Sequence, residues 1–146
     1  MRRDHQFTFQ LYQGTLEEIC CLSNLREAFR AVKRNKGSPG IDRVTIEQYE
    51  SNLEEELNKL HKEVLSWTYK PSPVRRVEIP KPGRGKEVRK LGIPTVKDRV
   101  LQAAIKNVLE PIIDPHFSPK SYGFRPGLGA QQAIQAAQQI VQSGKE

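Results

Sequence analysis

The chain has 146 residues, of which 36% are hydrophobic and 28% are charged, and its formal net charge at pH 7 is +7. That length and composition are typical of one globular domain, or part of one. No apolar run approaches the 18 residues that a membrane-spanning helix needs, and the first residues lack the apolar segment of a signal peptide. A cytoplasmic protein without a membrane partner is therefore expected.

The positions of the cysteine and histidine residues argue against a disulfide bond and against a zinc site. Cys20 and Cys21 are adjacent, which is a poor geometry for bridging each other, and the three histidines are scattered without the spacing of a zinc site. We expect two buried free thiols in an apolar helical stretch.

The first part of the chain predicts two helices behind an arm. Residues 1–14 alternate apolar and polar side chains, as either a small strand or an arm that packs on a partner would. Thr15 with Glu18 forms a capping-box pattern, which predicts a short helix through Leu22. A second helix is expected to begin at Ser23 and to stop at Lys36. Its inward stripe is predicted to be Leu25, Ala28, Phe29 and Val32.

A turn cluster, GSPGIDRV over residues 37–44, separates this helix from the next. The local pattern leaves open whether the cluster is a simple connector or a binding loop. Thr45 and Gln48 form another capping box, which starts a long amphipathic segment with a break expected near Ser51. The apolar positions of that segment are Ile46, Tyr49, Leu53, Leu57, Leu60, Val64, Leu65 and Trp67.

The stretch between residues 69 and 99 concentrates the charge of the protein. It holds ten Lys and Arg against three acidic residues, a net of +7, so the remainder of the chain sums to zero. Alternation on either side of a Pro- and Gly-rich segment predicts an antiparallel hairpin with a basic tip. A single basic finger favours a polyanion with a defined docking place over a merely solvated face. Because side chains alternate between the two faces of a strand, Arg75, Val77 and Ile79 share one face, and Arg89, Leu91 and Ile93 share a face of the returning strand.

The last part of the chain predicts two helices joined by a dense loop. Thr95 caps the first helix together with Asp98, so Asp98 is better explained as a cap partner than as a catalytic acid. Pro111 and Pro115 are expected to end this helix. The loop that follows, FSPKSYGFRPGLG, is rich in glycine, proline and aromatic residues. A helix over residues 130–143 is expected to turn inward its apolar residues Ala133, Ile134, Ala137, Ile140 and Val141.

Three of these segments, GSPGID, the basic hairpin and SYGFRPG, occur in an order that is far more specific than any one of them. Together they resemble the N-terminal part of the reverse transcriptases encoded by group II introns, also called intron maturases. NLREAFRAVKRNKGSPGID is similar to motif 0 of that family, VRRVEIPKP with LGIPTVKDRVLQAAI to motif 1, and LEPIIDPHFSPKSYGFRPG to motif 2. The resemblance covers roughly residues 24–143.

The resemblance implies an α+β fold, a mostly helical fingers subdomain of a right-hand polymerase with a small antiparallel β-hairpin or sheet. It divides the chain into an N-terminal extension with a short helix, residues 1–23, and the fingers region, residues 24–146. In the family the hairpin closes over the template, the primer and the incoming deoxynucleoside triphosphate (dNTP). Lys and Arg suit that role because they stabilise phosphoryl oxygens.

The resemblance also implies residue roles. The nucleotide-binding residues would be Arg75, Lys81 and Arg89. The RNA- or template-binding residues would be Lys36, Gly37, Ser38, Pro39, Gly40, Arg76, Arg84, Lys86, Ile93, Pro94, Gly123, Phe124 and Arg125. Two departures from the family bear on this: Arg43 stands where a glycine usually follows GID, and a longer hairpin tip leaves the third nucleotide-binding cation open between Arg89 and Lys86.

Polymerisation by this family needs two Mg ions held by aspartates that lie beyond motif 2, including a Tyr-X-Asp-Asp turn. The sequence contains no Asp-Asp pair. We therefore expect the parent protein to be an RNA-directed DNA polymerase that uses Mg, and this chain to hold no catalytic residue, to bind no metal and not to polymerise alone.

The partners implied by the resemblance are intron RNA, an RNA template with a DNA primer, and dNTP. Two alternatives stay open at this stage: a free-standing basic RNA-binding splicing cofactor, and a dimerisation module in which the apolar side chains of residues 7–12 form a homodimer contact.

Overall fold

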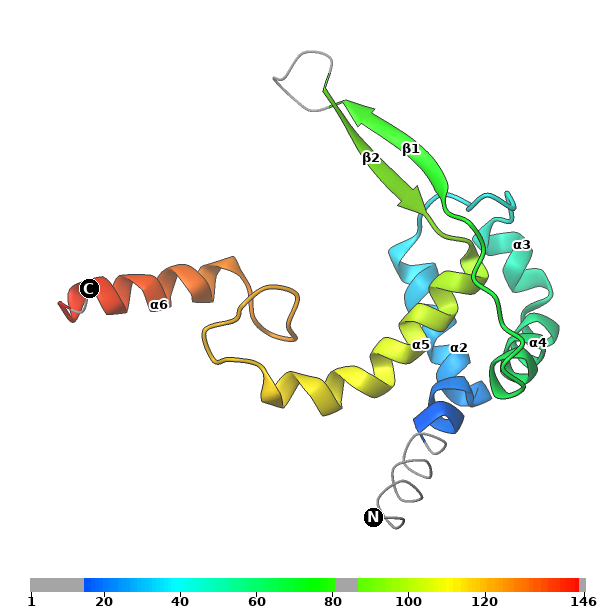
Figure 1. Ribbon diagram of the computed structural model, residues 1–146, viewed down its shortest axis with the longest axis horizontal. Helices are drawn as coiled ribbons and strands as arrows, with labels where there is room; N and C mark the ends of the chain where they lie inside the picture. Colours follow the sequence, from blue (N-terminus) through cyan, green and yellow to red (C-terminus); the bar gives the residue numbers. More distant parts are fainter. Residues whose placement is uncertain (1–14, 81–86, 145–146) are drawn as a thin grey trace, which may run out of the picture. The chain divides into compact units, whose positions relative to one another are not determined.

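A computed structural model describes residues 15–80 and 87–144, and the chain divides into two compact units, Met1–Val108 and Leu109–Glu146 (Figure 1). The fold is α+β, as predicted. Residues 15–20 form a helical stretch. The elements that follow are α2 (Leu22–Asn35), α3 (Ile46–Ser51), α4 (Leu53–Leu65), β1 (Arg75–Pro80), β2 (Val88–Ile93), α5 (Val96–Ile113), a 3₁₀ turn η1 (Asp114–His116) and α6 (Ala130–Gln142).

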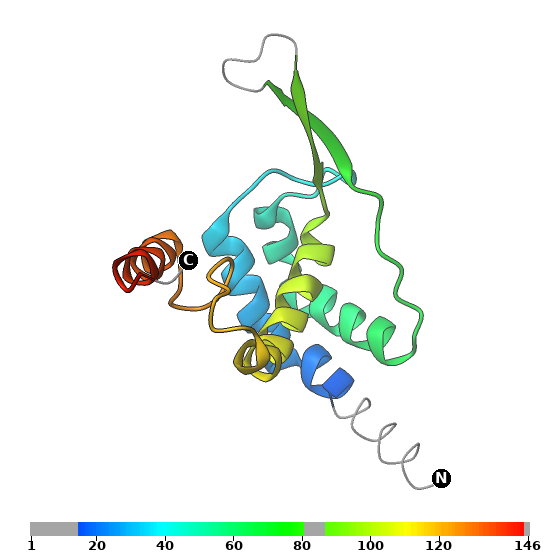
Figure 2. The same cartoon turned by 60° about the vertical axis from the view of Figure 1, so that its left-hand side comes forward.

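The core of the first unit is built from α2, α3, α4 and the first half of α5, with Ile19 from the preceding helical stretch (Figure 2). The stripe predicted for α2 is confirmed, since all four of its residues are buried. Asn24 ties two of these helices together, because its side-chain Nδ2 donates to the carbonyl of Ala104 at 3.1 Å and its Oδ1 accepts from Asn107 at 2.9 Å. The fully buried side chains of the core include Leu25, Leu57, Leu60, Val96 and Val100.

The start of α2 differs slightly from the sequence prediction. The preceding helical stretch ends at Cys20 rather than Leu22, and α2 begins at Leu22 with Cys21 at its N-cap. Both cysteines are free, but only Cys20 is buried, and that burial raises the pKa of its thiol. The predicted burial of Cys21 is wrong, because this residue lies at the break between two helices and not on an inward stripe.

The capping box predicted for α3 is present. The Gln48 backbone N–H donates to Thr45 Oγ1 at 3.2 Å, and the Thr45 backbone N–H donates to Gln48 Oε1 at 2.9 Å. The break expected near Ser51 separates α3 from α4. Trp67 was wrongly predicted on the apolar stripe: α4 ends at Leu65, and the Trp67 side chain is 82% exposed at a residue with φ +57°.

The predicted hairpin forms from β1 and β2, which pair antiparallel and extend away from the helices of their unit in both views (Figures 1 and 2). A segment without regular structure, residues 68–74, leads from α4 into β1. The strands are largely exposed, and their half-buried residues are Arg75, Val77 and Ile93.

The helix α5 begins after Thr95, as predicted, but it continues through Pro111 to Ile113. A proline removes one backbone hydrogen bond and crowds the carbonyl four residues earlier, and here only two residues of helix follow it. The helix therefore ends after Pro111, where η1 begins with Pro115 in its first turn.

The second unit holds α6, whose predicted extent is confirmed and whose predicted burial is wrong. None of its residues is buried, and Ile134, Ile140 and Val141 are exposed. Helical periodicity identifies which apolar residues share a face, but it does not establish that another element covers that face.

Candidate nucleic-acid interface

The pairing of the hairpin sets the direction of each side chain on it. Arg75 lies opposite Ile93, Val77 opposite Leu91 and Ile79 opposite Arg89. Residues directly opposite each other in an antiparallel pair point to the same face. The two predicted sets therefore form one face of the hairpin, and Arg76, Glu78 and Lys90 lie on the other.

The cations on the two strands are used in different ways. Arg76, Arg89 and Lys90 are exposed, and none of them forms an ion pair or a side-chain hydrogen bond with another residue in the described part of the chain. Arg75 is half-buried, and its Nε donates to the carbonyl of Pro39 at 3.0 Å. Of the predicted binding cations at the tip, Lys81, Arg84 and Lys86 lie outside the described residues.

The loop over residues 36–44 lies against the start of α5. An added Cβ at Gly40 would stand 2.6 Å from the Cα and 2.7 Å from the N of Thr95, and 3.0 Å from the carbonyl carbon of Pro94. Such distances to backbone atoms leave no room for a side chain. Gly40 is therefore required by close backbone contact, and it brings the loop against the link between β2 and α5.

A second contact on this loop comes from Arg99, which the sequence analysis did not single out. Its Nη2 donates to the carbonyl of Ser38 at 3.1 Å and its Nη1 to the carbonyl of Lys36 at 3.4 Å. Gly37, at φ +122°, makes room for this guanidinium, since a Cβ there would lie 2.8 Å from Nη1. No local pattern could have identified Arg99, because its partners lie some 60 residues earlier in the chain.

Arg75, Arg99, Gly37 and Gly40 together fix the position of the predicted template-binding residues of this loop. Lys36, Gly37 and Ser38 are exposed, whereas Pro39 and Gly40 are drawn inward. Ile93 and Pro94, predicted to line the template track, are half-buried beside them. The structure thus brings the hairpin base and the GSPG loop together.

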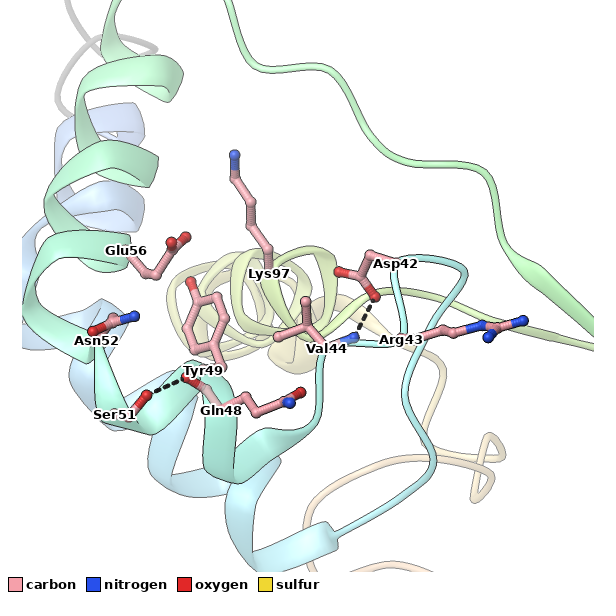
Figure 3. Close-up of a pocket in the computed structure, with 9 residues that line it drawn as sticks. All are labelled: Asp42, Arg43, Val44, Gln48, Tyr49, Ser51, Asn52, Glu56 and Lys97. Atoms are coloured by element: carbon pink, nitrogen blue, oxygen red, sulfur yellow. Dashed lines mark hydrogen bonds between the residues drawn. The ribbon is translucent and has the colours of Figure 1, made fainter.

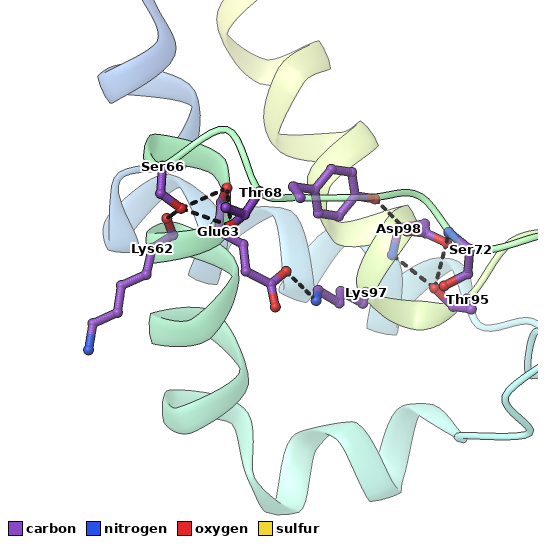
Figure 4. Close-up of polar contacts among 9 residues, drawn as sticks. Lys62, Glu63, Ser66, Thr68, Ser72, Thr95, Lys97 and Asp98 are labelled. Carbon is purple, nitrogen blue, oxygen red and sulfur yellow. Dashed lines mark hydrogen bonds and ion pairs between the residues drawn. The ribbon is translucent and has the colours of Figure 1, made fainter.

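A buried carboxylate holds the segment that leads into the hairpin (Figure 4). Asp98 is 3% exposed and accepts from the Tyr69 hydroxyl, from the Ser72 backbone N–H at 3.2 Å and from Thr95 Oγ1 at 2.7 Å. Burial, and then the bond to Asp98, raise the pKa of the Tyr69 hydroxyl above its ordinary value. Asp98 is thus a structural anchor, as its interpretation as a cap partner predicted.

The loop of the second unit is organised around Arg125. Its guanidinium makes five hydrogen bonds: two to the Asp114 carboxylate at 2.8 and 3.3 Å, and three to the carbonyls of Asp114, Ser118 and Ser121 at 3.0–3.1 Å. It also lies 5.7 Å from the centre of the Phe117 ring. These bonds to Arg125 hold the pKa of Asp114 below its ordinary value.

Next to Arg125 the other two predicted template-binding residues face outward. The Phe124 side chain is fully exposed at φ +58°, and nothing lies within 4 Å of a Cβ added to Gly123. An exposed ring can stack on a nucleic-acid base. Arg125 is used inside the loop, whereas the ring of Phe124 is fully exposed and that of Phe117 is half exposed.

A pocket of about 660 Å³ lies between α3, the start of α4, residues 42–44 and Lys97 (Figure 3). It carries both signs of charge, from Asp42 and Glu56 and from Arg43 and Lys97. The Asp42 carboxylate accepts from the Val44 backbone N–H at 3.2 Å, so this carboxylate has a structural role within a turn. This pocket includes none of the predicted binding residues.

Two further observations concern only the described residues. No three His, Cys, Asp or Glu side chains come together there as a possible metal site. None of the helices is both long enough and apolar enough to cross a bilayer.

No protein-family model matches the chain. It is 41% identical over 124 residues to the protein YkfC of Escherichia coli (strain K12) and 33% identical over 136 residues to the putative COX1/OXI3 intron 2 protein of Saccharomyces cerevisiae. It is 37% identical over 109 residues to the group II intron-encoded protein LtrA of Lactococcus lactis subsp. cremoris. These matches cover 83%, 92% and 73% of this chain but only 32%, 15% and 18% of the relatives, so the chain spans less than a third of each.

Proposed function

Because this chain belongs, through the segment it shares with them, to the group II intron-encoded proteins, we propose that it is the fingers portion of an RNA-directed DNA polymerase. In that role it binds intron RNA, a template with its primer, and the incoming dNTP. The chain spans only part of its relatives, so polymerisation is proposed for the parent protein and substrate binding for this segment.

The observation that carries the proposal is the exposure of three hairpin cations. Arg76, Arg89 and Lys90 project from two strands that stand away from the helices, without ion pairs to the described part of the chain. A cation that has no intramolecular partner keeps its full charge available to a phosphate. Phosphate binding is therefore the chemistry that this hairpin supports best.

Within the proposal the residues have separate tasks. Arg89, the described hairpin arginine nearest the tip, contacts the triphosphate or the phosphates of the nascent pair, because a guanidinium binds phosphate through two parallel bonds. Arg75 keeps one bond to Pro39 and so links the hairpin to the GSPG loop. Phe124 offers a ring for stacking on an unpaired base.

Mg ions supply the charge that stabilises the transferring phosphoryl group in polymerases. We assign no Mg ligand to the residues described, whose aspartates Asp42, Asp98 and Asp114 are each engaged in a turn, a cap network or an ion pair. The contribution proposed for this segment is to bind and orient phosphates.

The proposal is tested by binding of a fluorescent RNA template annealed to a DNA primer, measured across a range of salt concentrations. We expect binding to weaken steeply with salt, and Arg89→Ala to reduce the slope of log K against log salt by about one. Lys59→Ala is the matched control, since Lys59 is an exposed cation of α4. Binding that ignores salt, or an Arg89→Ala slope equal to that of the wild-type chain, contradicts the proposal.

A second candidate is an interaction module, which the exposed apolar residues of α6 favour. The dimer contact predicted for residues 7–12 lies outside the described residues. Sedimentation at micromolar concentration separates the candidates: a monomer that binds RNA supports the fingers role, and an RNA-independent dimer supports the module. A splicing cofactor would bind intron RNA equally well with or without an annealed primer.

A further inference from the structure

Trp67 occupies a position just after α4 at which helices most often place a glycine. The Thr68 backbone N–H donates to the carbonyl of Glu63 at 3.0 Å. The Trp67 backbone N–H donates to the carbonyl of Val64 at 3.2 Å. These two bonds form a Schellman motif, which requires a left-handed backbone conformation at Trp67. The residue accordingly has φ +57°.

A tryptophan at this position costs stability that its side chain does not recover by packing. The left-handed conformation is unfavourable for L-residues, and a bulky side chain is rare there. The Trp67 side chain is 82% exposed, and its ring has no aromatic or cationic partner in the described part of the chain. A backbone cost that folding does not repay points to a contact outside the chain.

A hollow of about 410 Å³ lies at the C-terminal end of α4, beside this residue. Its lining includes Ser66 and Thr68, the residues on either side of Trp67. The volume is within the range of roughly 300–1,000 Å³ that holds a small ligand, so one nucleotide fits it. The other lining residues are Glu55, Asn58, Lys59, Lys62 and Glu63.

The unpaired charge around the indole is mostly positive. Glu63 is neutralised by Lys97, whose Nζ lies 2.5 Å from its carboxylate (Figure 4). Lys62 and Lys70 are exposed, and neither has an ion pair among the described residues. Of the acids that line the hollow, Glu55 alone stays unpaired within that part of the chain. Lysine is depleted in protein–protein interfaces, whereas cations beside an aromatic ring are typical of sites for single-stranded nucleic acid, so the ligand favoured is RNA.

We infer that Trp67 is a stacking platform for one unpaired base of an RNA strand, with the adjoining sugar and phosphate in the hollow. Every base has a flat face that an indole can cover, so the contact requires an unpaired nucleotide but selects no particular base. Lys62 and Lys70 supply charge for the flanking phosphates. Lys59 lies about two helical turns before Trp67, so it remains a control. This inference rests on the nucleic-acid binding proposed above and adds a contact outside the hairpin.

The first test uses the fluorescence of Trp67, which is the only tryptophan of the chain. A single-stranded oligoribonucleotide is expected to quench its emission in a saturable manner that high salt reverses, and a blunt RNA duplex of the same length to quench it much less. Unchanged emission while the anisotropy of a labelled strand shows binding overturns the inference, as does equal quenching by the duplex. Emission that moves to shorter wavelength as the protein concentration rises without RNA indicates a protein contact and also overturns it.

The second test compares substitutions at this one position by the anisotropy of a labelled single-stranded RNA. Trp67→Leu keeps an apolar side chain and the backbone cost but removes the ring, so it is expected to weaken binding about tenfold. Trp67→Phe keeps a ring and should stay within about threefold of the wild-type chain. Trp67→Gly should weaken binding as much as Trp67→Leu while raising the melting temperature, so that unfolding does not explain the loss. Equal binding by the Leu and Phe variants overturns a stacking role.

The two proposals fail in distinguishable ways. If Arg89→Ala lowers the salt slope while Trp67→Leu binds single-stranded RNA like the wild-type chain, the hairpin role stands and the stacking platform is wrong. If Arg89→Ala leaves the slope unchanged while Trp67→Leu weakens binding and RNA quenches the tryptophan emission, the platform stands and the proposed role of the hairpin is wrong.

Discussion

The hairpin and the two Gly- and Pro-rich loops are both basic, but they use their arginines in opposite ways. On the strands, Arg76 and Arg89 are exposed and have no partner in the described part of the chain. Arg99, on α5, and Arg125, within the second loop, donate instead to backbone carbonyls in and next to these loops at 3.0–3.4 Å. The arginines that can contact a ligand and those that hold a loop are therefore different residues, and Arg75, although it lies on β1 beside Arg76, belongs to the second group.

This difference has a simple physical cause. A loop rich in glycine and proline makes few backbone hydrogen bonds of its own, so its carbonyls need donors from elsewhere. An arginine has five N–H donors in a rigid plane and can serve several carbonyls at once. On the hairpin only Arg75, at the base of β1, reaches such a carbonyl among the described residues, whereas Arg76 and Arg89 remain available for a ligand.

The largest loss of stability is expected from removing the carboxylate that anchors the hairpin to the core. Asp98→Ala removes a buried acceptor shared by Tyr69, Ser72 and Thr95, so it leaves three donors without a partner. We expect a loss of about 3 kcal/mol in the free energy of unfolding, measured by urea denaturation. Glu55→Ala, at an exposed acid of α4, should stay within about 0.5 kcal/mol. Equal effects of the two variants would contradict an anchoring role.

The second-largest effect is expected at the contact between the GSPG loop and the start of α5. A Cβ in Gly40→Ala would stand 2.6 Å from the Cα of Thr95, so the two backbones must separate. Overpacking of this kind costs about 1–3 kcal/mol, again measured by urea denaturation. The control is Gly123→Ala, where a Cβ meets nothing within 4 Å. A Gly40→Ala variant as stable as this control would show that the loop does not pack on α5.

The loop of the second unit is tested through the acid titration of Asp114. Its pKa is below its usual value because of Arg125, so the pair stabilises the folded state above the ordinary carboxyl pKa of 3.8. That stabilisation is lost as the pH falls through the lower pKa of the folded state. We expect Arg125→Ala to return the pKa of Asp114 toward 3.8, as followed by NMR. An unchanged titration in the variant would mean that Arg125 is not the cause.

The smallest expected effect is a gain in stability at Arg43. This residue has φ +60°, a conformation that costs most L-residues about 1–2 kcal/mol. Arg43→Gly should stabilise the chain by up to about 1 kcal/mol, since glycine also loses more entropy on folding. The same substitution inside α2, Arg30→Gly, should destabilise by about 1 kcal/mol. Melting temperatures of the two variants that move in the same direction would refute this account.

Much of the fold was available from local patterns. The stripe of α2, the capping box at Thr45, the break near Ser51 and the two strands of the hairpin all follow from periodicity and from residues with specific turn or cap chemistry. The resemblance to group II intron-encoded proteins is likewise confirmed by the relatives. The errors, at Cys21, Trp67, Pro111 and the apolar face of α6, concern where an element stops or what covers it, which periodicity does not encode.

Local sequence is enough to predict which segments are helices and strands and where the cations gather, because those properties depend on residues a few positions apart. Which cations remain available depends on contacts that form when distant segments come together. Arg75 and Arg99 are joined to carbonyls of the GSPG loop, 36 and 61 residues earlier in the chain, at Pro39 and Ser38, whereas Arg89 has no partner among the described residues. A hydrogen bond between distant segments exists only once the chain has folded, so no local pattern can reveal it.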